Sequence, residues 1–372
     1  MRRLRLRPST DNLLTYGLVI VAYIVIRILI ASGNISSALQ GQLVPITAYI
    51  VMAISLNLTV GVLGELSLGH AGFMSVGAFT GVITATLLST FADTTSLEWL
   101  SLALGMPWLR LALAMLFGGT MAGIFGFLIG VPVLRLHGDY LAIVTLAFGE
   151  IIKNVMNVIY IGCDANGILR ISAVSANDLQ LSEGGKIILS GPMGAIGITK
   201  ISSFTAGFIL ILITLFVVLN LINSRAGRAI KAVRDDKIAA ESVGISTWRY
   251  RMMAFVTSAT LAGAAGALYA LNYSTVVARK FDFNTSILIL VFVVLGGMGN
   301  IRGSIIAATV LTVLPEVLRA FNEVRMLAYA VILILVMLIR NNSTLRRLFR
   351  RNGRNGAMRK KNLLNGGKGD EA

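Results

Sequence analysis

Apolar runs of about 20 residues recur along the whole chain, and each is long enough to cross the hydrocarbon core of a membrane as a helix. A helix is favoured there because it pairs its own backbone donors and acceptors where no water is present. Ten candidate spans occur, at residues 13–31, 43–63, 67–90, 108–131, 139–160, 204–222, 252–272, 284–300, 303–320 and 326–340. The sequence therefore predicts an all-α fold, a polytopic membrane helix bundle of about ten transmembrane helices.

The amino-acid composition excludes most other classes of protein. Of the 372 residues, 56% are hydrophobic and only 13% are charged, whereas a soluble domain has about 45–50% apolar and about 25% charged residues. The net charge of +16 does not indicate nucleic acid as a partner, because the basic residues form short blocks between apolar runs. One cysteine and two histidines are too few for a disulfide framework or a metal site.

The basic residues also predict how the chain crosses the membrane, since Lys and Arg collect on the cytoplasmic side. If the N-terminus is cytoplasmic, 23 of the 33 Lys and Arg residues lie in inner segments and seven lie in outer loops. The reverse orientation would invert this bias. We therefore expect both termini to be cytoplasmic.

The same pattern divides the chain into segments. A basic N-terminus (1–12) precedes the transmembrane region (13–340), whose first apolar run is too long for a signal peptide and is interpreted as a retained helix. Two polar loops interrupt this region, an outer loop at about 161–203 and a charged cytoplasmic loop at about 223–250. The basic, glycine-rich tail (341–372) is predicted to be a disordered cytoplasmic anchor.

Residues 61–79 are unusually rich in glycine for a membrane helix, which predicts a break at membrane depth. Freed backbone groups at such a break can bind a polar solute and line a translocation path. The glycines could instead permit close helix packing, and both roles can hold at once. His70 is interpreted as a hydrogen-bonded structural group. The path candidates in this segment are Gly61, Gly64, Ser67, Gly69, His70 and Gly72.

A second polar group lies in the run 139–160. Asp139 suits the start of a helix, where the helix dipole favours a carboxylate. Thr145 and Glu150 then fall within an apolar span, where a carboxylate is costly and should face the bundle interior or water. Both are path candidates. Glu150 would contact a solute ammonium group, or it would lock helices together through Lys153.

Residues 227–246 are the most charged part of the cytoplasmic loop and predict one amphipathic helix. Ile230, Val233 and Ile238 fall on roughly one side of it, and Gly244 is suited to end it. Such a helix either docks in a groove of another protein or rests on anionic lipid.

A fourth segment, residues 294–304, is another glycine-dense break between two apolar runs. Together with residues 61–72 it indicates a weak internal repeat. Both breaks fall at the inner ends of helices that run inward, so the repeat would be parallel rather than inverted.

These four segments, in this order and spacing, resemble the membrane permease subunits of ABC importers for branched-chain amino acids. The resemblance covers roughly residues 40–340 and is carried by GELSLGHAGF, GDYLAIVTLAFGEI, GRAIKAVRDDKIAAESVGI and VLGGMGNIRGS. It implies a multi-pass protein of a prokaryotic cell membrane. It also implies partners in the lipid bilayer and at its two faces: a related second permease subunit, two cytoplasmic ATPase subunits and an extracytoplasmic solute-binding protein.

The resemblance further implies that the helix at 227–246 contacts an ATPase. In the wider group this helix often reads Glu-Ala-Ala followed by a glycine; Ala239, Ala240 and Gly244 keep that spacing, but Ile238 replaces the glutamate. The coupling candidates are Gly227, Arg228, Arg234, Asp235, Ala239, Ala240, Glu241 and Gly244. The sequence has no Walker A loop, so we expect no cofactor bound by this chain, no enzymatic activity of its own, and ATP used by partner subunits.

Other functions stay open at this point. A permease for urea or short-chain amides of the same superfamily would share the core motifs. An ion-coupled secondary transporter would need no ATPase contact, so residues 227–246 argue against it. Neither the solute that is carried nor the chain that selects it follows from the sequence.

Overall fold

The computed structural model describes residues 8–33, 36–94, 105–136, 138–164, 168–175, 177–179, 181, 185–318, 327, 330, 331 and 334. The chain divides into two units, the first ending at Val313 and the second beginning at Leu314. The tenth predicted span, 326–340, lies largely outside the described residues, and the tail 341–372 lies wholly outside them.

Seven helices among the described residues are long and apolar enough to cross a membrane, and they coincide with the first seven predicted spans. They are α1 (Pro8–Ala31), α2 (Ser37–Asn57, continued to Leu63), α3 (His70–Thr94), α5 (Pro107–Val133), α6 (Asp139–Val158), α7 (Phe204–Asn223) and α10 (Thr247–Ala270). The polytopic helical bundle is therefore confirmed. The count of ten spans and the cytoplasmic location of the termini stay predictions.

Two further helices occupy the next two predicted spans. Helix α11 (Phe283–Gly296) has 14 residues, and α12 (Ile301–Val317) has 17 and ends one residue before the described segment does. At a rise of 1.5 Å per residue α11 is about 21 Å long, less than the ~30 Å of hydrocarbon. The turn between them contains Gly297 and Gly299, both at positive φ, so the predicted span 284–300 ends in a tight reversal.

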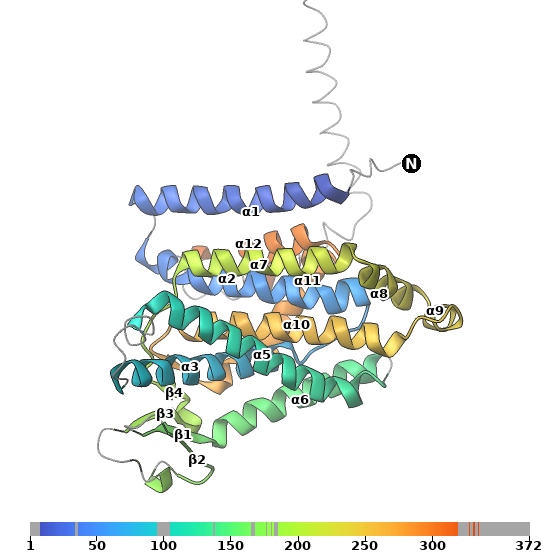
Figure 1. The fold of residues 1–372 in the computed structure, drawn as a ribbon. Coiled ribbons are helices and arrows are strands. Elements are labelled where there is room, and N and C mark those ends of the chain that lie inside the picture. The colour runs from blue at the N-terminus through green and yellow to red at the C-terminus, as the bar shows by residue number, and fades with distance from the viewer. Residues whose placement is uncertain are drawn as a thin grey trace, which may run out of the picture. The chain divides into compact units, whose positions relative to one another are not determined.

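Helix α2 lies at the centre of the helices in the first unit (Figure 1), where it packs against α7, α10 and α11. Almost all of its residues from position 43 onward are buried, as expected of a helix that is apolar on every side. Helix α10 in turn packs against α3 and α5. A Cβ at Gly77 of α3 would overlap the backbone of Gly263 on α10, so this contact depends on close backbone approach.

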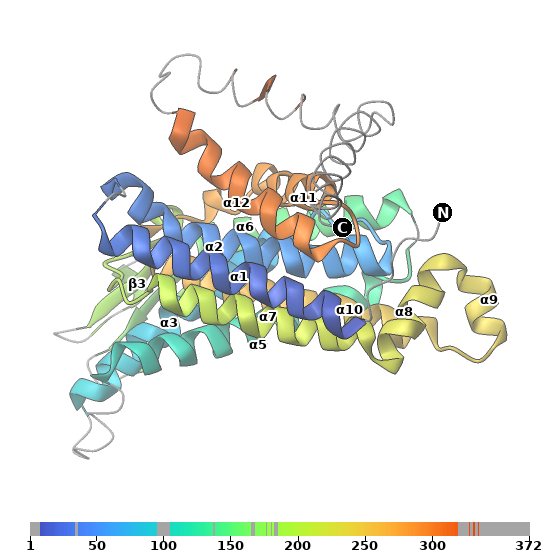
Figure 2. The same ribbon diagram turned by 90° about the horizontal axis from the view of Figure 1, so that it is seen from above.

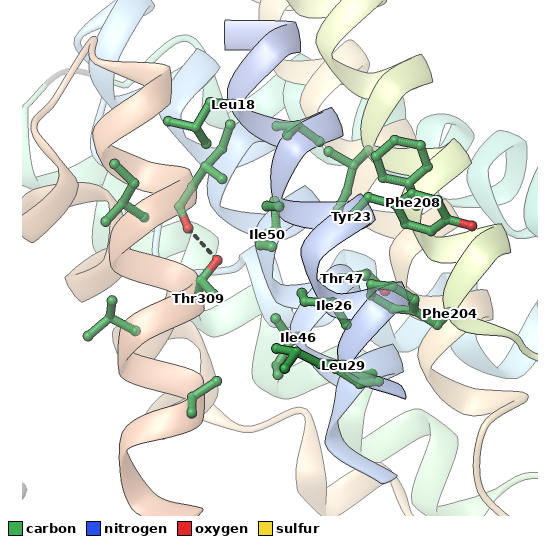
Figure 3. Close-up of a pocket in the computed structure, with 18 of the residues that line it drawn as sticks. Leu18, Tyr23, Ile26, Leu29, Ile46, Thr47, Ile50, Phe204, Phe208 and Thr309 are labelled. Atoms are coloured by element: carbon green, nitrogen blue, oxygen red, sulfur yellow. Dashed lines mark hydrogen bonds between the residues drawn. The ribbon is translucent and has the colours of Figure 1, made fainter. Parts of the chain in front are cut away.

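Helix α1 is the least buried of the seven, with 11% of its span covered. It contacts α7 through the stacked rings of Tyr23 and Phe208, whose centroids lie 4.1 Å apart. Elsewhere an apolar groove of about 590 Å³ separates α1 from α2 and α12 (Figure 3). Such a groove is expected of a helix that stands largely among lipid chains.

The predicted outer loop contributes most of an antiparallel five-stranded sheet of order β2-β1-β3-β4-β5, whose fifth strand follows α10. Its strands are β1 (Tyr160–Cys163), β2 (Leu169–Ser172), β3 (Lys186–Ser190), β4 (Ala195–Ile196) and β5 (Thr275–Val276), with 3-10 turns at Asn177–Leu179, Gly191–Met193 and Ala278–Lys280. In its register Ile161 pairs with Ile171 on one side and with Leu189 on the other. The all-α prediction therefore omitted a small sheet, because strands of two to five residues are too short to show a clear alternation.

The predicted cytoplasmic loop forms two helices, α8 (Arg225–Asp235) and α9 (Lys237–Ser242). Figure 1 and Figure 2 show them at one end of the bundle and the sheet at the opposite end. The two long polar loops thus lie at opposite ends of the bundle, and the side of the membrane that each of them faces stays a prediction.

Candidate functional site

The predicted break after the second span is present. Helix α2 continues beyond Asn57 as a π-helix (Leu58–Leu63) that ends at Gly64, whose φ of 84° lies in the left-handed region. The chain is then irregular until α3 begins at His70. π-Helical turns are rare and are found mainly at functional positions.

A buried asparagine joins this break to the turn between α11 and α12. Asn57 is fully buried; its Nδ2 donates to Ser304 Oγ at 2.9 Å, and its Oδ1 accepts from the Gly299 backbone N–H at 2.8 Å. A Cβ at Gly61 would overlap the backbone of Gly299, so the two glycine-dense segments of the sequence meet in space. Asn57 was not among the predicted site residues, although an amide in an apolar run is a signal that could have identified it.

The break also packs closely against α6. A Cβ at Gly69 would lie 2.8 Å from the carbonyl carbon of Thr145, and one at Gly72 would lie 2.9 Å from the Cα of Gly149. Thr145 Oγ1 accepts from the Leu68 backbone N–H at 3.1 Å. The structure therefore brings together three of the predicted path residues, Gly69, Gly72 and Thr145, in a close contact between backbones.

Two further path candidates are interior residues. His70 is buried, and its Nε2 lies 2.8 Å from Ser55 Oγ, in agreement with its interpretation as a structural group. Ser67 is also buried, and its hydroxyl has no hydrogen-bond partner among the described residues. Most of the path candidates are thus packed against other parts of the protein, and the hypothesis that they line a translocation path stays a prediction.

Glu150 forms an ion pair with Lys153, but both belong to α6. The pair therefore does not connect two helices in the way that the sequence hypothesis required. Its i, i+3 spacing places the two side chains on one face of the same helix. The Glu150 side chain keeps 35% of its surface exposed, so contact with a solute stays a prediction.

The single amphipathic helix predicted at 227–246 is wrong, because the chain breaks at Asp236. This residue has extended backbone and caps α9 by accepting from the Ala239 N–H at 3.0 Å. Ile230 on α8 is buried against the π-helix and Val233 is also buried, but Ile238 on α9 is 80% exposed. Two consecutive aspartates, the second followed by a short helical pattern, were the signal for this cap.

The coupling candidates lie on both helices. Gly227 is buried against the carbonyl groups of Leu221 and Ile222, and Ala240 is also buried. Gly244 ends this segment at a φ of 84°, as predicted, and a Cβ there would meet open space. The remaining candidates have exposed positions: Arg228, Arg234, Asp235, Ala239 and Glu241.

Arg234 connects α8 directly to the π-helix. Its Nη1 donates to the Gly61 carbonyl at 3.2 Å, and its aliphatic stem covers Gly64, where a Cβ would lie 2.5 Å from Arg234 Cγ. Its other donors pair with Asp235. A coupling candidate thus contacts two path candidates, and no pattern in the sequence predicts this contact.

These contacts form one wall of a charged pocket of about 320 Å³, bounded by the π-helix end, the start of α6, and α8–α9. Glu65 in this pocket forms an ion pair with Arg251 of α10, whose Nη2 donates to the Leu136 carbonyl at 3.2 Å. Burial raises the pKa of the Glu65 carboxyl, and Arg251 opposes this effect without cancelling it. This pair was not among the predicted site residues, because its members are 186 positions apart in the sequence.

Comparison with known proteins gives a consistent result. A family model described as "Branched-chain amino acid transport system / permease component" matches residues 39–340. The chain is 38% identical over 300 residues to the high-affinity branched-chain amino acid transport system permease protein LivM of Escherichia coli strain K12, which is 78% of this chain and 66% of LivM. No solved structure matches.

Shorter matches extend to other permeases. The corresponding LivH protein of Salmonella typhimurium is 33% identical over 118 residues, 31% of this chain and 38% of LivH. The fructose import permease protein FruG of Bifidobacterium longum is 29% identical over 161 residues, 41% of this chain and 47% of FruG. The family model, by contrast, covers most of this chain, including the π-helix break, α6, α8–α9 and the turn before α12. The chain therefore belongs to the family of permease components of branched-chain amino acid transport systems.

Proposed function

We propose that this chain is a permease subunit of a binding-protein-dependent ABC importer and forms part of the membrane path for branched-chain amino acids. It would work in a prokaryotic cell membrane with a related second permease subunit, two cytoplasmic ATPase subunits and an extracytoplasmic solute-binding protein. The chain binds no nucleotide in this proposal, and ATP is used by the partner subunits.

The observation that carries this proposal is the surface of α8–α9. Ile238 and Val243 are 80% and 73% exposed beside Ala239 and Gly244, on a segment too polar to enter the bilayer. Large exposed apolar side chains of this kind mark an interaction site. On its other face the same segment is fixed to the π-helix through Arg234 and Ile230. Movement of an ATPase against α8–α9 would therefore reach the break in α2 through a short, continuous set of contacts.

The substrate class rests on the relatives. LivM and LivH are named as branched-chain amino acid permeases, whereas FruG is named as a fructose permease and NupC of Lactococcus lactis as a nucleoside permease. The match to LivM is both longer and closer than the matches to FruG and NupC. Branched-chain amino acids are therefore the substrate we propose, with urea or short-chain amides as the alternative.

The proposal is tested by reconstituting the complete importer in liposomes and measuring ATPase activity and uptake with leucine, urea, fructose and a nucleoside. We expect stimulation by leucine alone. Ile238→Asp should abolish copurification of the ATPase subunits, because a charge would be placed in the contact. Val174→Asp, at a similarly exposed apolar side chain of the opposite end, should leave copurification unchanged. An Ile238→Asp subunit that still binds the ATPase at wild-type level would contradict the docking role.

A further inference from the structure

The pocket between the π-helix, α6 and α8–α9 has walls of two kinds. Five of its side chains carry charge, with both signs present: Glu65, Asp139, Arg234, Lys237 and Arg251. Four others are apolar: Leu63, Leu66, Leu141 and Val233. A cavity with a few convergent polar groups and apolar walls is the usual form of a small-molecule site.

Glu65 has an unmet hydrogen-bonding requirement in this wall. Its Oε1 accepts from Arg251, whereas its Oε2 is buried and has no hydrogen-bond partner among the described residues. The side chain keeps only 18% of its surface exposed. An oxygen that is both charged and shielded from water is costly to leave unpaired, and a cationic donor satisfies it best.

We propose that this pocket binds a small zwitterionic amino acid with an apolar side chain. The ammonium group would donate to Glu65, and the carboxylate would lie in the positive field of Arg234 and Lys237. The side chain would contact Leu63, Leu66 and Leu141. The pocket volume of about 320 Å³ is at the lower end of the range for ligand sites, which suits a single amino acid rather than a nucleotide or an oligosaccharide.

Binding here would regulate the importer. The pocket touches α8–α9 and the π-helix together, so an occupant stabilises the arrangement in which Arg234 holds Gly61. A ligand that binds one arrangement better than the other shifts the equilibrium towards it. At the predicted cytoplasmic end, the occupant would be the imported amino acid, which then slows its own uptake. This consequence rests on the proposed function for the identity of the solute.

The test uses the complete importer in liposomes, where only complexes with outward-facing ATPase subunits use ATP added to the bath. Leucine and binding protein enclosed in the lumen should stimulate ATPase activity, and failure of this arm would contradict the proposed function alone. Leucine added to the bath reaches the pocket, and should lower the stimulated rate and bind the complex in a calorimetric titration. If luminal leucine stimulates ATPase activity normally, but leucine in the bath neither lowers that rate nor binds the complex, the inference is overturned and the proposed function is unaffected.

Two analogues of leucine test separately whether the pocket recognises the ammonium group and whether it recognises the carboxylate. 4-Methylpentanoate lacks the ammonium group of leucine and 3-methylbutylamine lacks its carboxylate, so each should bind the wild-type complex at least about tenfold more weakly than leucine. Equal binding of 4-methylpentanoate, or of inorganic phosphate, would show an anion site and refute the proposal. Because this comparison needs no mutation, it holds even if a variant fails to assemble.

The matched variants are Arg234→Gln and Arg225→Gln, since both arginines lie on α8 but only Arg234 lines the pocket. Arg234→Gln and Glu65→Gln should each weaken leucine binding at the cytoplasmic side by at least about tenfold. Arg225→Gln should bind leucine as the wild type does. Equal losses in Arg225→Gln and Arg234→Gln would place the effect outside the pocket and overturn the inference.

Discussion

Replacement of Asn57 by alanine tests whether the break in α2 is stabilised by its contact with the α11–α12 turn. The side chain is fully buried and makes two hydrogen bonds, to Ser304 and to the Gly299 N–H. In the alanine variant the Ser304 hydroxyl keeps its bond to the Asn300 carbonyl at 3.3 Å, but the Gly299 N–H loses its partner. Gly299 is itself exposed, so its freed N–H can turn to water, and each of the two lost hydrogen bonds costs about 0.5–1.5 kcal/mol. We therefore expect the free energy of unfolding to fall by about 1–3 kcal/mol.

The assay is equilibrium unfolding of the purified subunit in mixed micelles, followed by tryptophan fluorescence. Asn220→Ala is the control, because Asn220 is exposed near the end of α7 and its replacement should change the free energy of unfolding by less than about 0.5 kcal/mol. If Asn57→Ala is as stable as this control, the two glycine-rich segments do not depend on the asparagine. The argument that joins the break to α11–α12 would then be wrong.

Two further predictions concern the packing of the break and the topology. Gly69→Ala should destabilise the subunit by about 1–3 kcal/mol and reduce uptake, because the added Cβ would overlap the backbone of Thr145. Gly17→Ala on α1 is the control and should be neutral, because a Cβ there meets no atom within 4 Å. Equal stability of the two variants would contradict the close packing at Gly69. Cysteines introduced at Lys186 and at Ser242 in a cysteine-free background should react with an impermeant maleimide from opposite sides of the membrane, and labelling from one side would refute the predicted topology.

The transmembrane helices could be predicted from the sequence because the signal is local. The length and apolarity of a run such as 204–222 can be read directly from its residues, and no distant residue is needed to identify it as a membrane span. The same local reasoning was wrong about the length of a helix where a glycine-rich turn interrupts an apolar run. The run 284–300 is mostly apolar, yet α11 ends at Gly296 because the chain reverses at Gly297 and Gly299. The sheet was missed for the opposite reason, since its strands are too short to carry a pattern.

The candidate site could be located from the sequence but not assembled. Glycine density marked the segments around Gly61 and Gly299 separately, and nothing in one sequence indicates that they touch. The pairing of Glu65 with Arg251 could not be predicted either, because several arginines of the predicted cytoplasmic segments could equally have paired with that carboxylate. Within α8–α9 the amphipathic pattern was real as far as Val233, and the cap at Asp236 then turned Ile238 outward.

The π-helix at the end of α2 holds an extra residue, and a change in its winding would rotate the segment that follows it. Each π turn closes a hydrogen bond over five residues rather than four, so it holds one residue in excess of the α-helical repeat. If residues 58–63 relaxed to an α-helix, the surplus residue would pass into the following segment, which would turn by about 100° around the axis of α2 and advance by about 1.5 Å. Such a rotation would carry the Gly61 carbonyl away from Arg234 while the buried body of α2 stayed in place. A central helix can therefore reorient one end, together with the side chains of α8 that contact it, while its buried body stays in place.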